Sequence, residues 1–182
     1  MQKIIGLLLI LGMAVTAVAI PNIAEAVDDT FDITVTISFL TITLRDSGDS
    51  EAYGTWALGA MSLEGTKTMV KTTDEIYVDV GESSAYTLSG KVTSETDWAA
   101  NATIGTDLYV LKLMGAAEAA AAPEVATSGT VMETSGGSAQ AISGGTGALG
   151  VDIRLYAHFM APDETTTGAE QTMTVTITIE AA

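Results

Sequence analysis

Apolar and polar residues alternate strictly along two long segments, one near each end of the chain. The apolar members of the first segment are Phe31, Ile33, Val35, Ile37 and Phe39, and single polar residues separate them. Because successive side chains of a strand point to opposite faces, this pattern predicts a half-buried β-strand. The phase changes at Phe39-Leu40, where we expect a β-bulge or a crossing between sheets before the alternation continues to Leu44.

The segment at the other end repeats the pattern, with Met173, Val175, Ile177 and Ile179 alternating with threonines. Shorter runs bounded by Gly, Ser and Asp predict further strands between the two. We expect these at 55–59, 66–71, 75–80, 85–93, 106–114, 130–134 and 151–160. With about eight to ten strands and no long amphipathic helix, the pattern predicts an all-β antiparallel sandwich, Ig-like or jelly-roll-like.

Residues 115–150 depart from this pattern and are rich in Ala, Gly, Ser and Thr. We expect a long loop there, with a helical turn at 116–122 before Pro123 and short strands around Val131-Met132 and Ala141-Ile142. The segment is nearly free of aromatic and charged side chains, which favours a packing or spacing role over recognition.

The N-terminus has the layout of a cleavable signal peptide. Lys3 precedes an uncharged apolar run from Ile4 to Ile20, and Ala24-Glu25-Ala26 supplies small residues for cleavage. We expect a signal peptide at 1–26 and one mature sandwich domain at 27–182; cleavage after Ala19 and a pilin-like leader cut near Gly6 are the alternatives. The run is short for a membrane span and no basic cluster follows it, so no permanent membrane anchor is expected.

Charge and cysteine content narrow the choice of partners. The chain carries 23 acidic against 7 basic residues, a formal net charge of −16. Binding nucleic acid requires a basic surface, so nucleic acid is not an expected partner. The sequence contains no Cys, so neither disulfides nor a lipid-modified Cys are expected, and the fold must rest on burial and sheet hydrogen bonds.

The sequence offers little for catalysis. His158 is the single histidine, and the alternation in 151–160 places it on the face opposite Ile153 and Leu155, as a surface side chain. No G-x-S-x-G sequence presents a serine nucleophile. Adjacent carboxylates such as Asp74-Glu75 point to opposite faces of a strand and do not form a glycosidase pair. We therefore expect no enzyme activity, no catalytic residue and no cofactor other than calcium.

Two places are candidate ligand sites. Asp46, Asp49 and Glu51 crowd a Gly-Ser turn and offer oxygen ligands for calcium, although their spacing is not that of an EF-hand loop. The alternative for these residues is a solvated turn. Trp98 lies in a turn-like stretch, where it is a candidate for stacking on a surface glycan. Trp56 alternates with Leu58 and is expected in the core.

Several short motifs along the mature chain suggest a resemblance. They are Trp56-Ala57-Leu58-Gly59, Ile76-Tyr77-Val78, Trp98 before Asp107-Leu108-Tyr109, and Phe159-Met160-Ala161-Pro162 ahead of the last threonine-rich segment. In these the chain resembles a group of small exported bacterial β-sandwich surface proteins. The resemblance implies export and fold, and it transfers no functional residue.

Two functions remain as hypotheses. The first is an exported structural or adhesive cell-surface protein, a self-assembling filament or surface-layer subunit whose donor strand, Asp28 to Leu44, completes a neighbour's sheet. The same strand pairing within its own domain is the alternative reading. The second is a monomeric extracellular module that binds glycan or calcium. Both place the mature chain outside the cell or on its surface, with the periplasm as the alternative.

Overall fold

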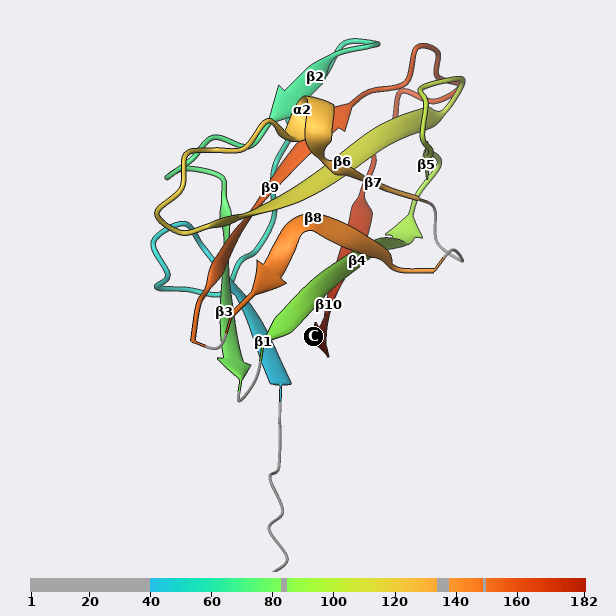
Figure 1. The fold of residues 1–182 in the computed structure, drawn as a ribbon. Helices are drawn as coiled ribbons and strands as arrows, with labels where there is room; N and C mark the ends of the chain where they lie inside the picture. The colour runs from blue at the N-terminus through green and yellow to red at the C-terminus, as the bar shows by residue number, and fades with distance from the viewer. Residues whose placement is uncertain (1–39, 83–84, 134–137, 149) are drawn as a thin grey trace, which may run out of the picture. The chain divides into compact units, whose positions relative to one another are not determined.

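A computed structural model describes residues 40–82, 85–133, 138–148 and 150–182 (Figure 1). The chain divides into two compact units, residues 1–36 and 37–182, and all of the described residues belong to the second. The predicted signal peptide and the alternating residues Phe31, Ile33, Val35, Ile37 and Phe39 lie outside the described residues.

The described unit is built of β-strands, with one four-residue helix, α2 (Val125–Ser128), among its described residues. The prediction of an all-β fold is confirmed. The strands are β1 (Leu40–Arg45), β2 (Thr66–Thr68), β3 (Ile76–Glu82), β4 (Tyr86–Glu95), β5 (Ala99–Ala100), β6 (Leu108–Ala117), β7 (Thr130–Met132), β8 (Gln140–Gly147), β9 (Ile153–Met160) and β10 (Met173–Ala181).

All of these strands join into a single sheet. Its main order is β1-β3-β9-β6-β8-β4-β10, with β2 added to β9 and with β5 and β7 added to β6. Most neighbours are antiparallel, whereas β6–β8 and β5–β6 are parallel. The sheet curls until its first and last strands, β1 and β10, are in contact, so it is nearly closed like a barrel. A division into the two facing sheets of a sandwich stays a prediction.

The sheet has one weak join, between β6 and β8. A single bridged pair, Met114 with Ser143, forms their ladder. The hydroxyl group of Thr130 on β7 adds two contacts to β8: it donates to the Ala141 carbonyl oxygen at 3.1 Å and accepts the Ser143 N–H at 2.9 Å. On either side the ladders are long, as in β6–β9 and β4–β10.

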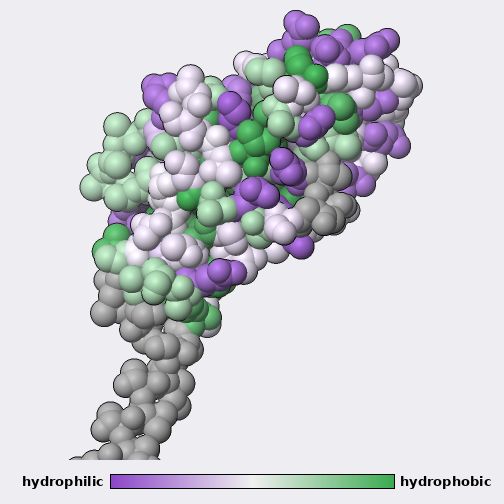
Figure 2. All heavy atoms as spheres, turned by 45° about the vertical axis from the view of Figure 1, so that its right-hand side comes forward, coloured by the Kyte–Doolittle hydropathy of each residue, from purple (hydrophilic) through white to green (hydrophobic). Residues whose placement is uncertain are grey.

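The core lies inside the curled sheet. It takes side chains from most strands, and Tyr109 and Phe159 stack at its centre with ring centroids 5.3 Å apart. The largest fully buried apolar side chains are Tyr86, Tyr109, Tyr156, Phe159, Leu88, Met132, Ile153 and Leu155. Outside, strongly hydrophilic residues crowd the upper end of the face seen in Figure 2, and near-neutral and apolar residues occupy much of its middle.

The predicted alternation is confirmed in the described parts of both end segments. In β1, Leu40, Ile42 and Leu44 are half-buried while Thr41 and Thr43 are exposed. In β10 the apolar residues are likewise half-buried and every threonine between them is exposed.

Other predicted elements differ from the structure. The segment predicted as a strand at 55–59 has no regular secondary structure, and Gly59 has a positive φ of 72° that interrupts extended backbone. The helical turn predicted at 116–122 was wrong, because β6 continues to Ala117 in register with β9. The helix begins at Val125, after Pro123. The short strands predicted around 131–132 and 141–142 are confirmed as β7 and β8.

Candidate functional site

The two end strands of the sheet each keep one edge without a ladder to another described strand. β1 pairs with β3 from Leu40 to Arg45, and β10 pairs with β4 from Met173 to Ala181. β1 and β10 contact each other, yet among the described residues no β-ladder joins them. We call the strip between these two strands the seam. An unpaired strand edge is a template for another strand, because its N–H and C=O groups point outward.

The inward side chains of the seam strands are less deeply buried than those of the strands next to them. On the strands next to the seam strands, Val78 of β3 and Leu88 of β4 are 0% and 1% exposed. The inward side chains of the seam strands pack against the same core but are only partly buried. They are Leu40, Ile42, Leu44, Met173, Val175, Ile177 and Ile179. At the end of β1 a bridge from Arg45 to Ala52 occupies this edge, and the Leu44 carbonyl oxygen accepts the Tyr53 N–H at 2.8 Å. Over the rest of its length the seam combines strand edges that lack a ladder with apolar side chains that an added strand would cover.

The donor segment predicted from sequence runs directly into β1. Its last residues, Leu40 to Leu44, pair with β3 of the same chain. For residues 31–39 to lie beside β1 in their own chain, the backbone would have to reverse near Ser38-Phe39. Tight hairpins need a loop of at least two residues, usually containing Gly, Asn or Asp. Residues 33–41 contain none of these, which disfavours a tight hairpin of this segment on β1.

The structure corrects the predicted position of His158. Its side chain is 6% exposed, not on the surface, and Tyr156 on the same face of β9 is 1% exposed. α2 packs over this face, so β9 is covered on both sides. The imidazole Nδ1 lies 2.7 Å from the Thr68 hydroxyl oxygen. Burial, with a smaller contribution from the charge of Lys112, holds the pKa of His158 below its usual value, which favours the neutral ring.

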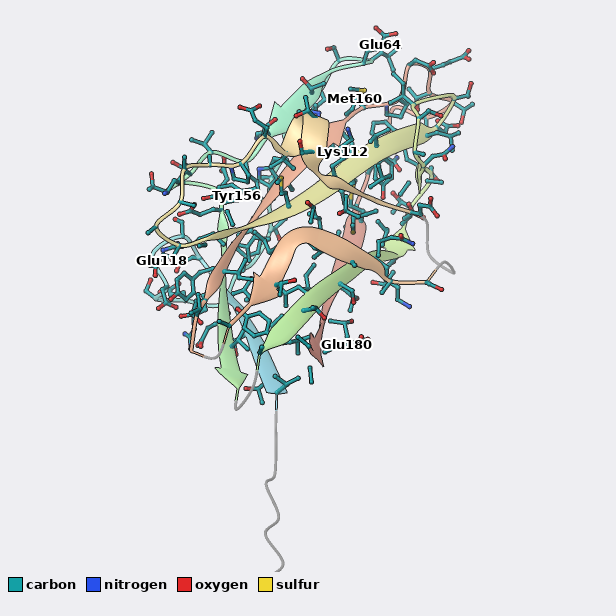
Figure 3. The ribbon with its side chains drawn as sticks, in the orientation of Figure 1. Glu64, Lys112, Glu118, Tyr156, Met160 and Glu180 are labelled. Carbon is teal, nitrogen blue, oxygen red and sulfur yellow. The ribbon has the colours of Figure 1, made fainter. Side chains whose placement is uncertain are left out.

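A pocket of about 290 Å³ opens beside His158. Its walls are mainly apolar and include Ile104, Val110 and Met160. Lys112 and Met160 lie next to α2 (Figure 3). The Lys112 ammonium donates to the Ala126 carbonyl oxygen at 2.6 Å, so one of its hydrogen bonds closes the rim of the pocket. No carboxylate lines the pocket to orient the histidine as a base, and the geometry gives no acid–base pair.

A buried polar network, which the sequence did not indicate, lies at the other end of β9. Glu75 is 2% exposed and accepts hydrogen bonds from Arg154 and from the Tyr156 hydroxyl. The guanidinium of Arg154 also stacks on the Tyr77 ring, 4.4 Å from its centroid. Burial and the contact with Glu75 raise the pKa of Tyr156 above its usual range. The pattern gave no signal for the burial of Glu75, because it reads as one of two adjacent carboxylates at the start of the strand expected at 75–80.

The predicted calcium ligands are Asp46, Asp49 and Glu51. The Asp46 carboxylate accepts the backbone N–H groups of Ser50 at 2.8 Å and Glu51 at 3.3 Å, which lowers the pKa of Asp46. Asp49 instead lies 3.4 Å from the Arg45 guanidinium. In the described part of the chain, no three His, Cys, Asp or Glu side chains gather in a way that could hold a metal ion. Calcium binding stays a prediction.

The predicted glycan residue, Trp98, is half-buried against the core. Its indole N–H donates to the Thr165 hydroxyl oxygen at 2.9 Å, and its backbone N–H donates to the Gln171 side chain at 3.2 Å. The ring is therefore anchored to the segment before β10. Trp56 is also half-buried against the core, and its buried indole nitrogen has no hydrogen-bond partner among the described atoms.

Comparisons with known proteins gave no match for this chain. No protein-family model, no curated protein and no solved structure matches the chain. Among the described residues, no helix has the length and apolar character needed to cross a membrane.

Proposed function

We propose that this protein is an exported structural subunit of a cell surface that assembles by strand donation. Residues 31–39 of one copy occupy the seam between β1 and β10 of the next. The observation that carries the proposal is the seam itself, where two strand edges lack a ladder and seven apolar side chains are only partly buried.

The donor and the seam fit each other chemically. An extended guest strand gains backbone hydrogen bonds along an open edge, and alternate side chains enter the host. The five apolar residues of 31–39 recur at every second position, as the inward residues of β1 and β10 do. A guest strand in the seam therefore covers the partly buried side chains of β1 and β10. The side chains that cover them are Phe31, Ile33, Val35, Ile37 and Phe39.

The signal-peptide layout of residues 1–26 supports export. Once that peptide is removed, the donor segment lies close to the new N-terminus, where it is free to reach a neighbour. A sandwich of two facing sheets, as predicted from the sequence, would then be completed by the guest strand. The cell surface is the proposed location, and a periplasmic assembly is the alternative.

A matched pair of substitutions tests the donor strand. Val35→Asp puts a charge on the face that enters the seam, and Thr36→Asp puts the same charge on the opposite face. We expect the mature chain 27–182 and Thr36→Asp to form filaments or large oligomers, and Val35→Asp to remain monomeric. Light scattering after size-exclusion chromatography, with negative-stain microscopy, measures both. Assembly that tolerates Val35→Asp as well as Thr36→Asp would overturn the proposal.

Disulfide formation between introduced cysteines distinguishes donation of the strand to a neighbour from pairing of the strand within its own chain. Because the chain has no Cys, chains carrying only Thr36→Cys can be mixed with chains carrying Cys at Thr174, Thr176 or Thr178. A disulfide-linked dimer that forms across the mixture, and is lost when Val35→Asp is added to the Thr36→Cys chain, indicates donation between copies. A stable monomer that Val35→Asp destabilises without any change in size would instead show the strand in its own seam. Calcium and glycan titrations of that monomer would then test the binding-module alternative.

A further inference from the structure

The outer face of β8, β4 and β10 is a surface of short hydroxyl-bearing and small side chains. The registers place Thr178 beside Ser89 and Ala141, and Glu180 beside Thr87 and Thr146. Thr93 and Thr176 pair across the strands, with their hydroxyl oxygens 3.0 Å apart. We call this surface the threonine face. Its members are Thr87, Ser89, Lys91, Thr93, Ala141, Thr146, Thr174, Thr176, Thr178 and Glu180.

Charge is nearly absent from this face. Lys91 and Glu180 are its two charged members, and Glu180 lies at the C-terminal end of β10 (Figure 3). The whole chain carries 23 acidic residues and a net charge of −16. Copies of such a chain repel each other wherever carboxylates face carboxylates. A face with a single carboxylate, that of Glu180 at its end, is where two copies can approach.

The side chains of the face also suit close contact between flat surfaces. Threonine is β-branched and holds few rotamers in a strand, so ordering it at an interface costs little entropy. Its hydroxyl group donates and accepts, so two copies of one face can satisfy each other's hydrogen bonds. Such a self-complementary contact is the kind that a two-fold axis generates.

We propose that the threonine face is the lateral contact between neighbouring copies of this chain, and hence between filaments. Three strands of this length cover roughly 400 Å², well under the ~800 Å² per partner of a stable pairwise interface. A single contact is therefore weak. Many such contacts act together when strand donation holds the copies in a row, so the binding between two rows is strong. In this respect the inference rests on the proposed assembly. Polar residues of the donor segment, such as Thr34 and Thr36, would extend the face next to β10.

Two substitutions that add the same charge test the lateral contact. Thr178→Glu places a carboxylate on the threonine face, and Thr66→Glu places one on an exposed threonine of β2, away from the face. We expect wild type and Thr66→Glu to form bundled or paired filaments in the electron microscope. Thr178→Glu should give single filaments of unchanged length, with bundling partly restored by salt, because salt screens the added charge.

The outcomes separate this inference from the proposed function. Loss of filaments in Val35→Asp concerns the donor strand, whereas single filaments in Thr178→Glu concern the face. Bundling of Thr178→Glu equal to wild type, or single wild-type filaments at every salt concentration, would overturn the lateral contact. If no filament forms, sedimentation equilibrium at high protein concentration compares the same chains. Weak wild-type dimers lost in Thr178→Glu would support the face, and identical monomers would refute it.

Discussion

The Arg154 guanidinium lies 3.2 Å from the carboxylate of Glu75 inside the protein, where Glu75 is 2% exposed. A second carboxylate, that of Glu118, lies 3.0 Å from the same guanidinium but has a side chain 57% exposed. One arginine thus holds a buried and an exposed ion pair. Their energies should differ, because solvent screens only the exposed one.

Glu75→Gln should destabilise the fold far more than Glu118→Gln. Glu75→Gln removes a buried carboxylate that accepts from Arg154 and Tyr156, and losing a charge-assisted hydrogen bond of this kind costs about 1.5–3 kcal/mol, although Glu118 still faces Arg154. Loss of an exposed pair costs about 1 kcal/mol or less. Urea denaturation of the two variants measures both values against wild type. Equal losses would mean that Glu75 is solvated in the folded protein.

Lowering the pH should weaken the fold through His158. The unfolded chain protonates this imidazole near pH 6.5, whereas the folded chain does so only at lower pH. The free energy of unfolding therefore falls as the pH drops below about 6.5, and above that value the histidine has no effect. His158→Gln should lose less stability than wild type between pH 7.5 and 5.5. Equal losses of stability in the two proteins, measured by urea denaturation at each pH, would contradict this. Both proteins carry the same carboxylates, so protonation of carboxylates lowers the stability of both alike.

Gly115→Ala should disturb the join between β6 and β8. A Cβ atom at Gly115 would lie 2.5 Å from the carbonyl oxygen of Gly144, which itself has a positive φ of 70°. Backbone must shift to admit it, at about 1–3 kcal/mol. Gly168, whose added Cβ meets nothing within 4 Å, is the control, and Gly168→Ala should change stability by about 0.5 kcal/mol or less. The denaturation midpoints of both variants, compared with that of wild type, measure these two changes in stability.

Gln171→Ala should loosen the turn between β4 and β5. The Gln171 amide oxygen accepts hydrogen bonds from the Thr96 hydroxyl at 2.6 Å, the Asp97 N–H at 3.0 Å and the Trp98 N–H at 3.2 Å. Losing this acceptor should cost about 1–2 kcal/mol and speed amide exchange at residues 97 and 98. Gln171→Glu keeps an acceptor oxygen and should keep slow exchange. Unchanged exchange in Gln171→Ala would show that water replaces the amide.

The sequence predicted the end strands well and the middle of the chain less well, for physical reasons. Period-two alternation indicates strands with one solvent-exposed face, such as β1 and β10. It misplaced His158, because β9 is central and covered on both faces, so polar residues there are buried as well. In the Ala- and Gly-rich stretch the pattern predicted β8 only around 141–142 and missed its full length, because β8 approaches β6 through small residues. Glu75 gave no signal, because its partners Arg154 and Tyr156 lie about eighty positions away.

The sheet resists deformation less at the join between β6 and β8 than along its longer ladders. Longer ladders join β1 to β3 and β9 to β6 on one side of this join, and β4 to β10 on the other. A single bridged pair and the Thr130 hydroxyl hold the two halves together. Deformation concentrates where the fewest hydrogen bonds resist it. A small rotation at this join would move β1 and β10 apart or together, so in the proposed assembly it would set how wide the seam opens to a donated strand.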